Sequence, residues 1–122
     1  MNDIASRQDI EKVVEAFYTK VKADELIGSI FSEVDWPHHL PVMYNFWSSI
    51  LLGDNSYTGN PFAKHISKGL KAEHFSRWLE LFFETVDEHF EGYVAGEAKN
   101  RAGTIARLFK YRLGLTETIS NE

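Results

Sequence analysis

The stretch HLPVMYNFWSSILL, residues 39–52, sets the helical character of the chain. One histidine and four large apolar residues recur in it at spacings of three and four: His39, Met43, Phe46, Trp47 and Ile50. At about 3.6 residues per turn these positions share one face of a helix. The pattern predicts a helix over residues 39–52 that ends before Gly53, a residue suited to a helix C-terminus.

Prolines surround the expected start of this helix. We expect Trp36-Pro37 to form a turn ahead of it. Pro41 is then acceptable, because it would lie in the first helical turn, where a backbone N–H has no partner within the helix. A loop is expected to follow from Gly53, and Pro61 is expected to open a short helical turn.

Helical periodicity also precedes this stretch. Ser6 and Asp9 have the spacing of an N-terminal capping box. An apolar stripe of helical spacing follows them: Ile10, Val13, Val14, Phe17 and Val21. A short helix is expected from Asp24, although Gly28 weakens it.

Two longer helices are expected in the second half of the chain. The first is marked by large apolar residues at helical spacing: Phe75, Trp78, Leu79, Phe82, Val86 and Phe90. The second is expected from Glu97 to Leu113, with Ala98, Ala102, Ile105 and Phe109 on one stripe. No alternating strand pattern occurs, so we expect one all-α domain over residues 1–122, with connections too irregular for an up-down bundle.

The composition excludes several classes of protein. The net charge of −5, without a clustered basic face, argues against a nucleic-acid partner. The absence of cysteine excludes disulfides, iron–sulfur clusters, thiolate zinc and thioether-attached haem. No apolar run is long enough to span a membrane. We expect a soluble, monomeric, cytoplasmic protein.

Two of the five histidines stand out as candidates for binding a metal. His39 lies at the edge of an apolar helical face, and His65 follows Gly59-Asn-Pro61, a segment able to hold an imidazole rigidly. Two such histidines and a surplus of aromatic residues are what a b-type haem requires. Spacing ranks them only weakly over His38, His74 and His89, and spacing alone favours a surface His39 and a His65 in an ordinary exposed turn.

Tyr18 and Trp78 each combine a large apolar body with one hydrogen-bond donor. Ordinary core packing explains both, and so does a pocket into which both donors point. Phe31, Phe46, Phe75 and Phe82 are expected in the core or a pocket wall. Basic residues around residue 65 fit either haem propionates or a solvated face: Lys64, Lys68, Lys71 and Arg77.

Several segments together resemble the group III truncated haemoglobins. They are Ala16–Val21, Ile30-Phe31, His39–Trp47, Leu52-Gly53, Tyr57–His65 and His74–Phe82. The resemblance covers residues 10–90 in order and with matching spacings. It implies a truncated globin fold, a helical sandwich around one haem b, iron protoporphyrin IX.

The resemblance also implies roles for particular residues. His65 matches the histidine that ligates the iron, and Tyr18 and Trp78 match the donors to the bound ligand. His39 matches a distal histidine that acts as a gate. Apolar and aromatic positions match the haem-contacting wall: Phe31, Met43, Phe46 and Trp47.

The expected function is reversible binding of O2, NO or another diatomic ligand, as in oxygen binding and transport. A haem enzyme with peroxidase-like or NO dioxygenase activity is the alternative, and it would need a separate reductase. A helical scaffold without cofactor is a third class. The residue pattern favours ligand binding over a dedicated enzyme but leaves the physiological ligand open.

Overall fold

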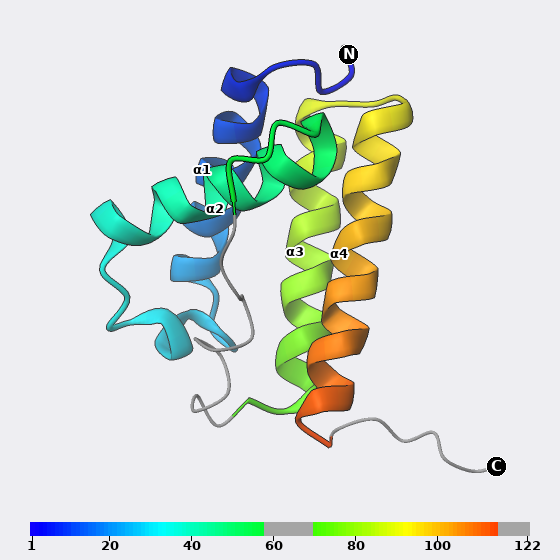
Figure 1. Ribbon diagram of the computed structural model, residues 1–122. Helices are drawn as coiled ribbons and strands as arrows, with labels where there is room; N and C mark the ends of the chain where they lie inside the picture. The colour runs from blue at the N-terminus through cyan, green and yellow to red at the C-terminus, as the bar shows by residue number, and fades with distance from the viewer. Residues whose placement is uncertain (58–69, 115–122) are drawn as a thin grey trace, which may run out of the picture.

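A computed structural model describes residues 1–57 and 70–114 of the chain. Its elements are α1 (Arg7–Ala23), the 3-10 helix η1 (Gly28–Phe31), α2 (Trp36–Leu52), α3 (Ala72–His89) and α4 (Tyr93–Arg112). Helices α3 and α4 run antiparallel side by side, while α1 packs against α3 and against α2, which crosses it (Figure 1). No strand occurs over these two ranges, and the predicted all-α class is confirmed.

The predicted capping box starts α1. The Asp9 backbone N–H donates to the Ser6 hydroxyl at 3.2 Å, and the Asp9 carboxylate accepts the Ser6 backbone N–H at 3.2 Å. Two donors at the helix start are therefore satisfied by one residue pair. The predicted stripe of α1 is buried throughout, together with Tyr18.

The predicted start of α2 is wrong, because the helix begins at Trp36 rather than after a turn there. The backbone N–H groups of His38 and His39 both donate to the Asp35 carbonyl, at 3.0 and 2.8 Å. Pro37 occupies the first turn, where proline fits well. Pro41 consequently lies inside the helix, beyond the first turn, and offers no N–H to the carbonyl four residues before it.

The predicted end of α2 is confirmed. Gly53 follows the helix with φ of 69°, a left-handed conformation that glycine adopts without a steric penalty. Its N–H donates to the Ser49 carbonyl at 3.2 Å. The short turn expected at Pro61 lies outside the described residues.

The short helix expected from Asp24 is replaced by a turn and η1. The Asp24 carboxylate accepts the backbone N–H groups of Leu26 and Ile27, at 3.0 and 3.1 Å, which holds a turn rather than a helix. Gly28 then passes close to α1, where a Cβ would lie 2.9 Å from the Lys22 carbonyl oxygen. This close approach explains why residue 28 is a glycine, the residue that weakened the prediction of a helix here.

Helix α4 begins at Tyr93, four residues earlier than predicted. Its first turn is capped by Asp3, whose carboxylate accepts the backbone N–H groups of Val94 and Ala95, at 2.9 and 2.8 Å. Gly92, with φ of 136°, lies against Asp3, where a Cβ would come within 2.5 Å of the carboxylate carbon. A cap from the far end of the chain leaves no local motif, so periodicity placed the start too late.

Replacing Asp3 with alanine is expected to lower the free energy of unfolding by about 0.5–2 kcal/mol, the usual effect of losing a helix N-cap. Urea unfolding of the two proteins would measure it. Asp35→Ala is the matched control, since Asp35 precedes α2 but its side chain makes no capping bond. Equal losses in the two variants would contradict a specific role for Asp3.

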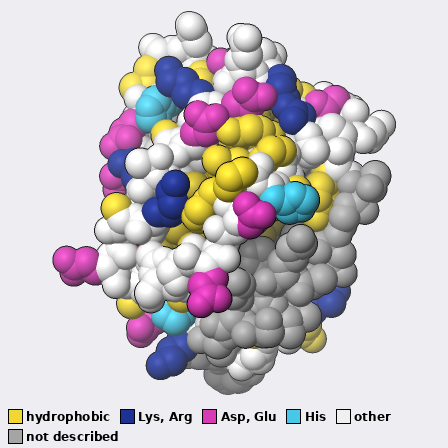
Figure 2. All heavy atoms as spheres, turned by 90° about the vertical axis from the view of Figure 1, so that its left-hand side faces the viewer, with side chains coloured by type: hydrophobic (Ala, Val, Ile, Leu, Met, Phe, Trp, Pro, Cys, Tyr) yellow, Lys and Arg dark blue, Asp and Glu magenta, His cyan; other side chains and the backbone are white. Residues whose placement is uncertain are grey.

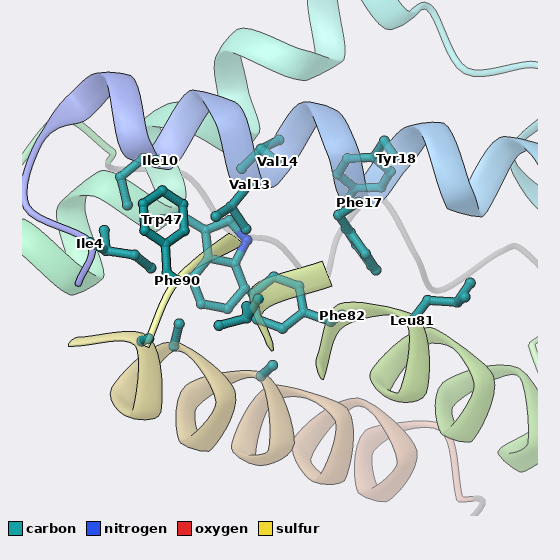
Figure 3. Close-up of a cluster of buried hydrophobic side chains, with 14 of the residues drawn as sticks. Ile4, Ile10, Val13, Val14, Phe17, Tyr18, Trp47, Leu81, Phe82 and Phe90 are labelled. Atoms are coloured by element: carbon teal, nitrogen blue, oxygen red, sulfur yellow. The ribbon is translucent and has the colours of Figure 1, made fainter. Parts of the chain in front are cut away.

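The main core lies where α1, α2 and α3 meet. Figure 3 shows Ile10 and Phe17 of α1 facing Trp47 of α2 and Phe82 of α3, with Ile4 closing one end. A second, smaller cluster joins the other end of α3 to α4 through Phe75, Ala106 and Phe109. The site described below lies between these two clusters, because it is lined by members of both.

The surface carries charges of both signs. On the face drawn in Figure 2, acidic and basic side chains are scattered on either side of a band of hydrophobic side chains. Among the helices of the described ranges, none is both long and apolar enough to cross a membrane.

Candidate functional site

An apolar pocket of about 690 Å³, its open mouth included, lies between the two clusters. Its walls come from α1, η1, α2, α3 and α4 and are mostly aromatic and aliphatic. The lining comprises Tyr18, Ile27, Ile30, Phe31, Met43, Phe46, Trp47, Leu70, His74, Phe75, Trp78, Ile105, Ala106 and Phe109. Ligand sites are typically concave and mostly apolar with a few polar groups, and this pocket has that composition.

Most of the residues predicted for the site lie around this pocket. Six of them line it: Tyr18, Phe31, Met43, Phe46, Trp47 and Trp78. His39 does not line it but packs beside it, with its ring centroid 5.5 Å from that of Tyr18 and 5.4 Å from that of Trp36. His65 lies outside the described residues.

Tyr18 and Trp78 lie next to each other in the pocket wall. Tyr18 is only 5% exposed, and burial raises the pKa of its hydroxyl well above the ordinary value of 10.0, although the hydrogen bond from the Trp78 side chain acts in the opposite direction. The indole N–H can only donate, so the Tyr18 oxygen is the acceptor. The tyrosine remains protonated and keeps its own O–H to donate elsewhere.

Aromatic packing holds the Trp78 indole in place. Phe82 lies nearly parallel to both Trp47 and Trp78, with ring centroids 4.8 and 6.0 Å apart and interplanar angles of 17° and 11°. Phe17 meets Trp78 edge-on, at 5.6 Å and 83°. The donor to Tyr18 is therefore fixed by its neighbours before any ligand arrives.

The sequence did not assign several lining residues to the site. His74, which spacing ranks below His39 and His65 as a candidate metal ligand, is partly buried and lines the pocket. Ile105 and Phe109 were predicted on an apolar stripe, yet periodicity alone could not show that part of this stripe faces a pocket. Ile27 and Ile30 reach it because Asp24 folds the chain into a turn and η1.

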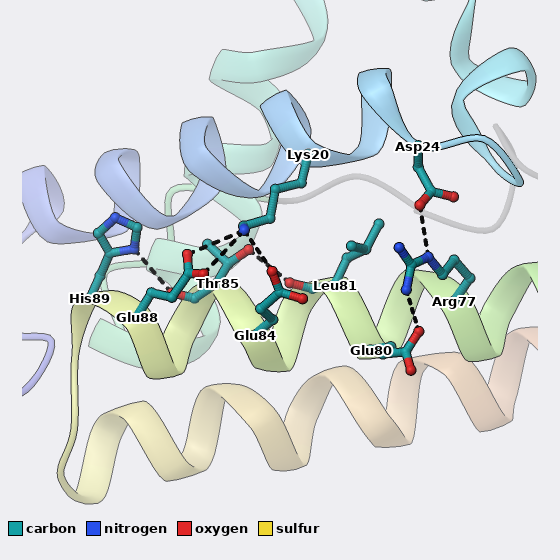
Figure 4. A network of polar contacts seen from close by, with 9 residues as sticks. All are labelled: Lys20, Asp24, Arg77, Glu80, Leu81, Glu84, Thr85, Glu88 and His89. Atoms are coloured by element: carbon teal, nitrogen blue, oxygen red, sulfur yellow. Dashed lines mark hydrogen bonds and ion pairs between the residues drawn. The ribbon is translucent and has the colours of Figure 1, made fainter.

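Hydrogen bonds distinguish two of the other histidines. His74 Nδ1 accepts the Lys71 backbone N–H at 2.9 Å, so the ring proton is on Nε2. His89 Nδ1 lies 3.0 Å from the Thr85 carbonyl, and it donates because a carbonyl only accepts (Figure 4). His38 is exposed. Within residues 1–57 and 70–114, no group of three or more His, Cys, Asp or Glu residues could hold a metal ion.

Of the basic residues considered for propionates, Arg77 already has acidic partners. Its Nε donates to the Asp24 carboxylate at 2.7 Å, and its Nη1 donates to Glu80 (Figure 4). Asp24 thereby ties the turn before η1 to α3, and its side chain is only 6% exposed. Lys71 is exposed, while Lys64 and Lys68 lie outside the described residues.

Acidic pH is expected to weaken the ion pair between Asp24 and Arg77. Burial raises the pKa of Asp24, but the Arg77 guanidinium and the backbone N–H groups of Ile27 and Leu26 outweigh burial and hold it below 3.8. The unfolded chain therefore takes up the proton first, and the stabilisation present above pH 3.8 is lost as the pH falls through the lower folded value.

Unfolding free energies measured between about pH 5 and pH 2 would test this. Wild type should lose stability steeply toward acid, and Asp24→Asn should show a shallower slope because that group no longer titrates. Parallel slopes in the two proteins would rule out the proposed contribution of Asp24.

Comparison with known proteins gives a consistent match. The family model described as bacterial-like globin matches residues 2–111. The group 3 truncated hemoglobin ctb of Campylobacter jejuni subsp. jejuni serotype O:2 is 33% identical over 115 residues, covering 88% of this chain and 91% of the relative.

Solved structures agree with the sequence matches. The crystal structure of group III truncated hemoglobin from Campylobacter jejuni superposes with a TM-score of 0.83 at 30% identity, covering 100% of both chains. A mutant truncated hemoglobin from Tetrahymena pyriformis, in its Fe(III) form, gives a TM-score of 0.70 at 26% identity. That match covers 84% of this chain and 88% of the other.

Globins of this family bind haem b, a flat apolar ring system with two carboxylates on one edge. The pocket fits such a group. Its walls are aromatic and aliphatic, and the side chains with a hydrogen-bonding group, among the described lining residues, are Tyr18, Trp47, Trp78 and His74. Matched over nearly its whole length in sequence and in fold, the chain belongs to the bacterial-like globin family and, within it, to the group III truncated haemoglobins.

Proposed function

We propose that this protein reversibly binds a diatomic ligand such as O2 at a haem held by His65. The observation that carries this proposal is that Tyr18 and Trp78, two side chains with a hydrogen-bond donor, lie next to each other in a mostly apolar pocket. The haem supplies a ferrous iron able to bind such a ligand. The residues that line the pocket determine its polarity and its shape, and they exclude water from it.

His65 is proposed as the iron ligand partly because the other histidines suit that role poorly. An iron ligand must present an unprotonated imidazole nitrogen to the pocket. His74 lines the pocket, but its Nδ1 is engaged with the Lys71 N–H and its Nε2 carries the proton. His89 is turned to the Thr85 carbonyl and does not line the pocket, and His38 is exposed.

Tyr18 is proposed as the main donor to the ligand. Its oxygen accepts from Trp78, which directs its own O–H toward another acceptor. A diatomic ligand that gains partial negative charge is such an acceptor, and the apolar surroundings strengthen the bond. Because burial raises the pKa of Tyr18, the donor stays protonated through the physiological range.

His39 is proposed as a gate rather than a donor. Its ring lies edge-on to both Tyr18 and Trp36, with interplanar angles of 78° in each case. It stands next to the proposed donor without lining the pocket. Movement of this side chain would therefore change access to Tyr18 more than the strength of its hydrogen bond.

An absorption spectrum of the purified protein tests the proposal. Loaded with haem and reduced, the protein should show an intense Soret band that shifts on adding O2 and returns when O2 is removed. A colourless protein that takes up no added haemin would refute haem binding. A haem protein that is oxidised at once by O2, with no reversible shift, would refute reversible binding.

A further inference from the structure

His74 adds an imidazole to a pocket whose other described lining side chains are apolar apart from the Tyr18 hydroxyl and the indole N–H groups of Trp47 and Trp78. It lies in the first turn of α3 and is partly buried. Trp78 follows four residues later on the same helix face, about one turn or 6 Å along the axis. The pocket therefore has polar groups at two levels of α3: the Tyr18–Trp78 pair and His74.

The hydrogen bond to the backbone fixes what His74 can offer. Its Nδ1 accepts the Lys71 N–H at 2.9 Å, so Nδ1 carries a lone pair and Nε2 carries the proton. In this neutral form the ring is a donor at Nε2. The capping contact also restrains the ring, which limits the entropy lost when Nε2 donates.

A haem b in this pocket would bring two carboxylates, which are costly to leave without donors beside apolar walls. Tyr18 and Trp78 lie at the other level, one helical turn further along α3 from His74. Arg77, on the same helix, is engaged with Asp24 and Glu80. The start of α3 also favours negative charge, since unpaired backbone N–H groups give that end a partial positive charge.

We propose that His74 Nε2–H donates a hydrogen bond to one haem propionate and thereby sets the orientation of the haem in the pocket. This inference rests on the proposed function, because it requires haem in the same pocket. It gives His74 two separate tasks: Nδ1 caps α3, and Nε2 holds the cofactor.

Two substitutions separate these tasks. In His74→Asn the amide oxygen can occupy the place of Nδ1 and keep the cap, but nothing reaches the place of Nε2. In His74→Gln the amide nitrogen can reach the place of Nε2, while the cap is lost. The rate of haem loss from the holoprotein to an excess of apomyoglobin is the readout for each.

We expect His74→Asn to lose haem about ten- to a hundredfold faster than wild type, as loss of a hydrogen bond to a charged group predicts. His74→Gln should stay within about threefold of wild type. Loading with haem dimethyl ester, which lacks the charged carboxylates, should abolish the difference between wild type and His74→Asn, because the interaction is then already absent.

Three outcomes would overturn the inference. His74→Asn could release ordinary haem at the wild-type rate, it could release the ester faster than wild type by the same factor as ordinary haem, or His74→Gln could be the faster of the two variants. The last two would assign His74 to packing or capping alone. If His74→Asn does not fold, His74→Gln and the ester on wild type still decide. Failure of the proposed function is distinct, since wild type would then give no Soret band.

Discussion

Replacing His65 with alanine is expected to leave a folded protein that no longer retains haem. An iron ligand bonds the metal directly, whereas loss of an outer partner of such a ligand costs roughly 10–100-fold in metal affinity. The loss for His65→Ala should exceed that range. Titration with haemin, followed by gel filtration and the Soret absorbance of the protein fraction, measures it, and added imidazole should restore part of the absorbance.

The chain offers a matched control in His89. Its Nδ1 donates to the Thr85 carbonyl within α3, and the side chain does not line the pocket, so His89→Ala should retain haem. His74→Ala should release haem faster but still take it up. Full haem retention by His65→Ala, with an unchanged ferrous spectrum, would show that another residue holds the iron.

Replacing Tyr18 with phenylalanine is expected to raise the rate of O2 dissociation about ten- to a hundredfold. The substitution removes one hydroxyl, and a hydrogen bond to a charged acceptor contributes about 1.5–3 kcal/mol. The ring itself stays buried between Phe17, Phe31 and Trp36, so the pocket walls should persist. Stopped-flow displacement of O2 by CO measures the rate directly.

The comparison with His39→Ala separates a donor from a gate. If His39 controls only access, its removal should raise the rates of O2 association and dissociation by the same factor and leave the O2 affinity within about threefold of wild type. Tyr18→Phe should instead change dissociation far more than association and so lower the affinity. An unchanged dissociation rate in Tyr18→Phe would show that Tyr18 does not stabilise the ligand.

Periodicity predicted the helices. The predicted helix boundaries were wrong where a contact with a residue distant in sequence sets the boundary, or where a proline lies at it. Helix α1 could be predicted from local sequence alone, because the apolar stripe through Val14 and Phe17 is local. The capping box of Ser6 and Asp9 that starts the helix is local as well. The start of α4 depends on Asp3, about ninety positions away, which no window of sequence includes. The start of α2 was misjudged because Trp36-Pro37 fits a turn and a helix start equally well.

The sequence predicted those site residues for which the family resemblance and the residue type both pointed to the pocket. Tyr18, Met43 and Trp78 line the pocket as the resemblance implies. That Tyr18 and Trp78 lie next to each other could not be anticipated, because it depends on how α1 and α3 approach each other. His74 was missed for a similar reason, since the pocket that it lines is built from several helices that are distant in sequence.

The cap that Asp3 places on α4 also constrains the order in which the chain can fold. Asp3 leaves the ribosome before its partners Val94 and Ala95, which lie 91 and 92 residues later in the chain. The contact therefore cannot form until α4 has been synthesised, however early α1 becomes helical. Joining two such distant segments requires closing a long loop, which places this step late among the contacts of the fold. The segment that holds Asp3 can therefore pair with α4 only after the chain between them has been synthesised.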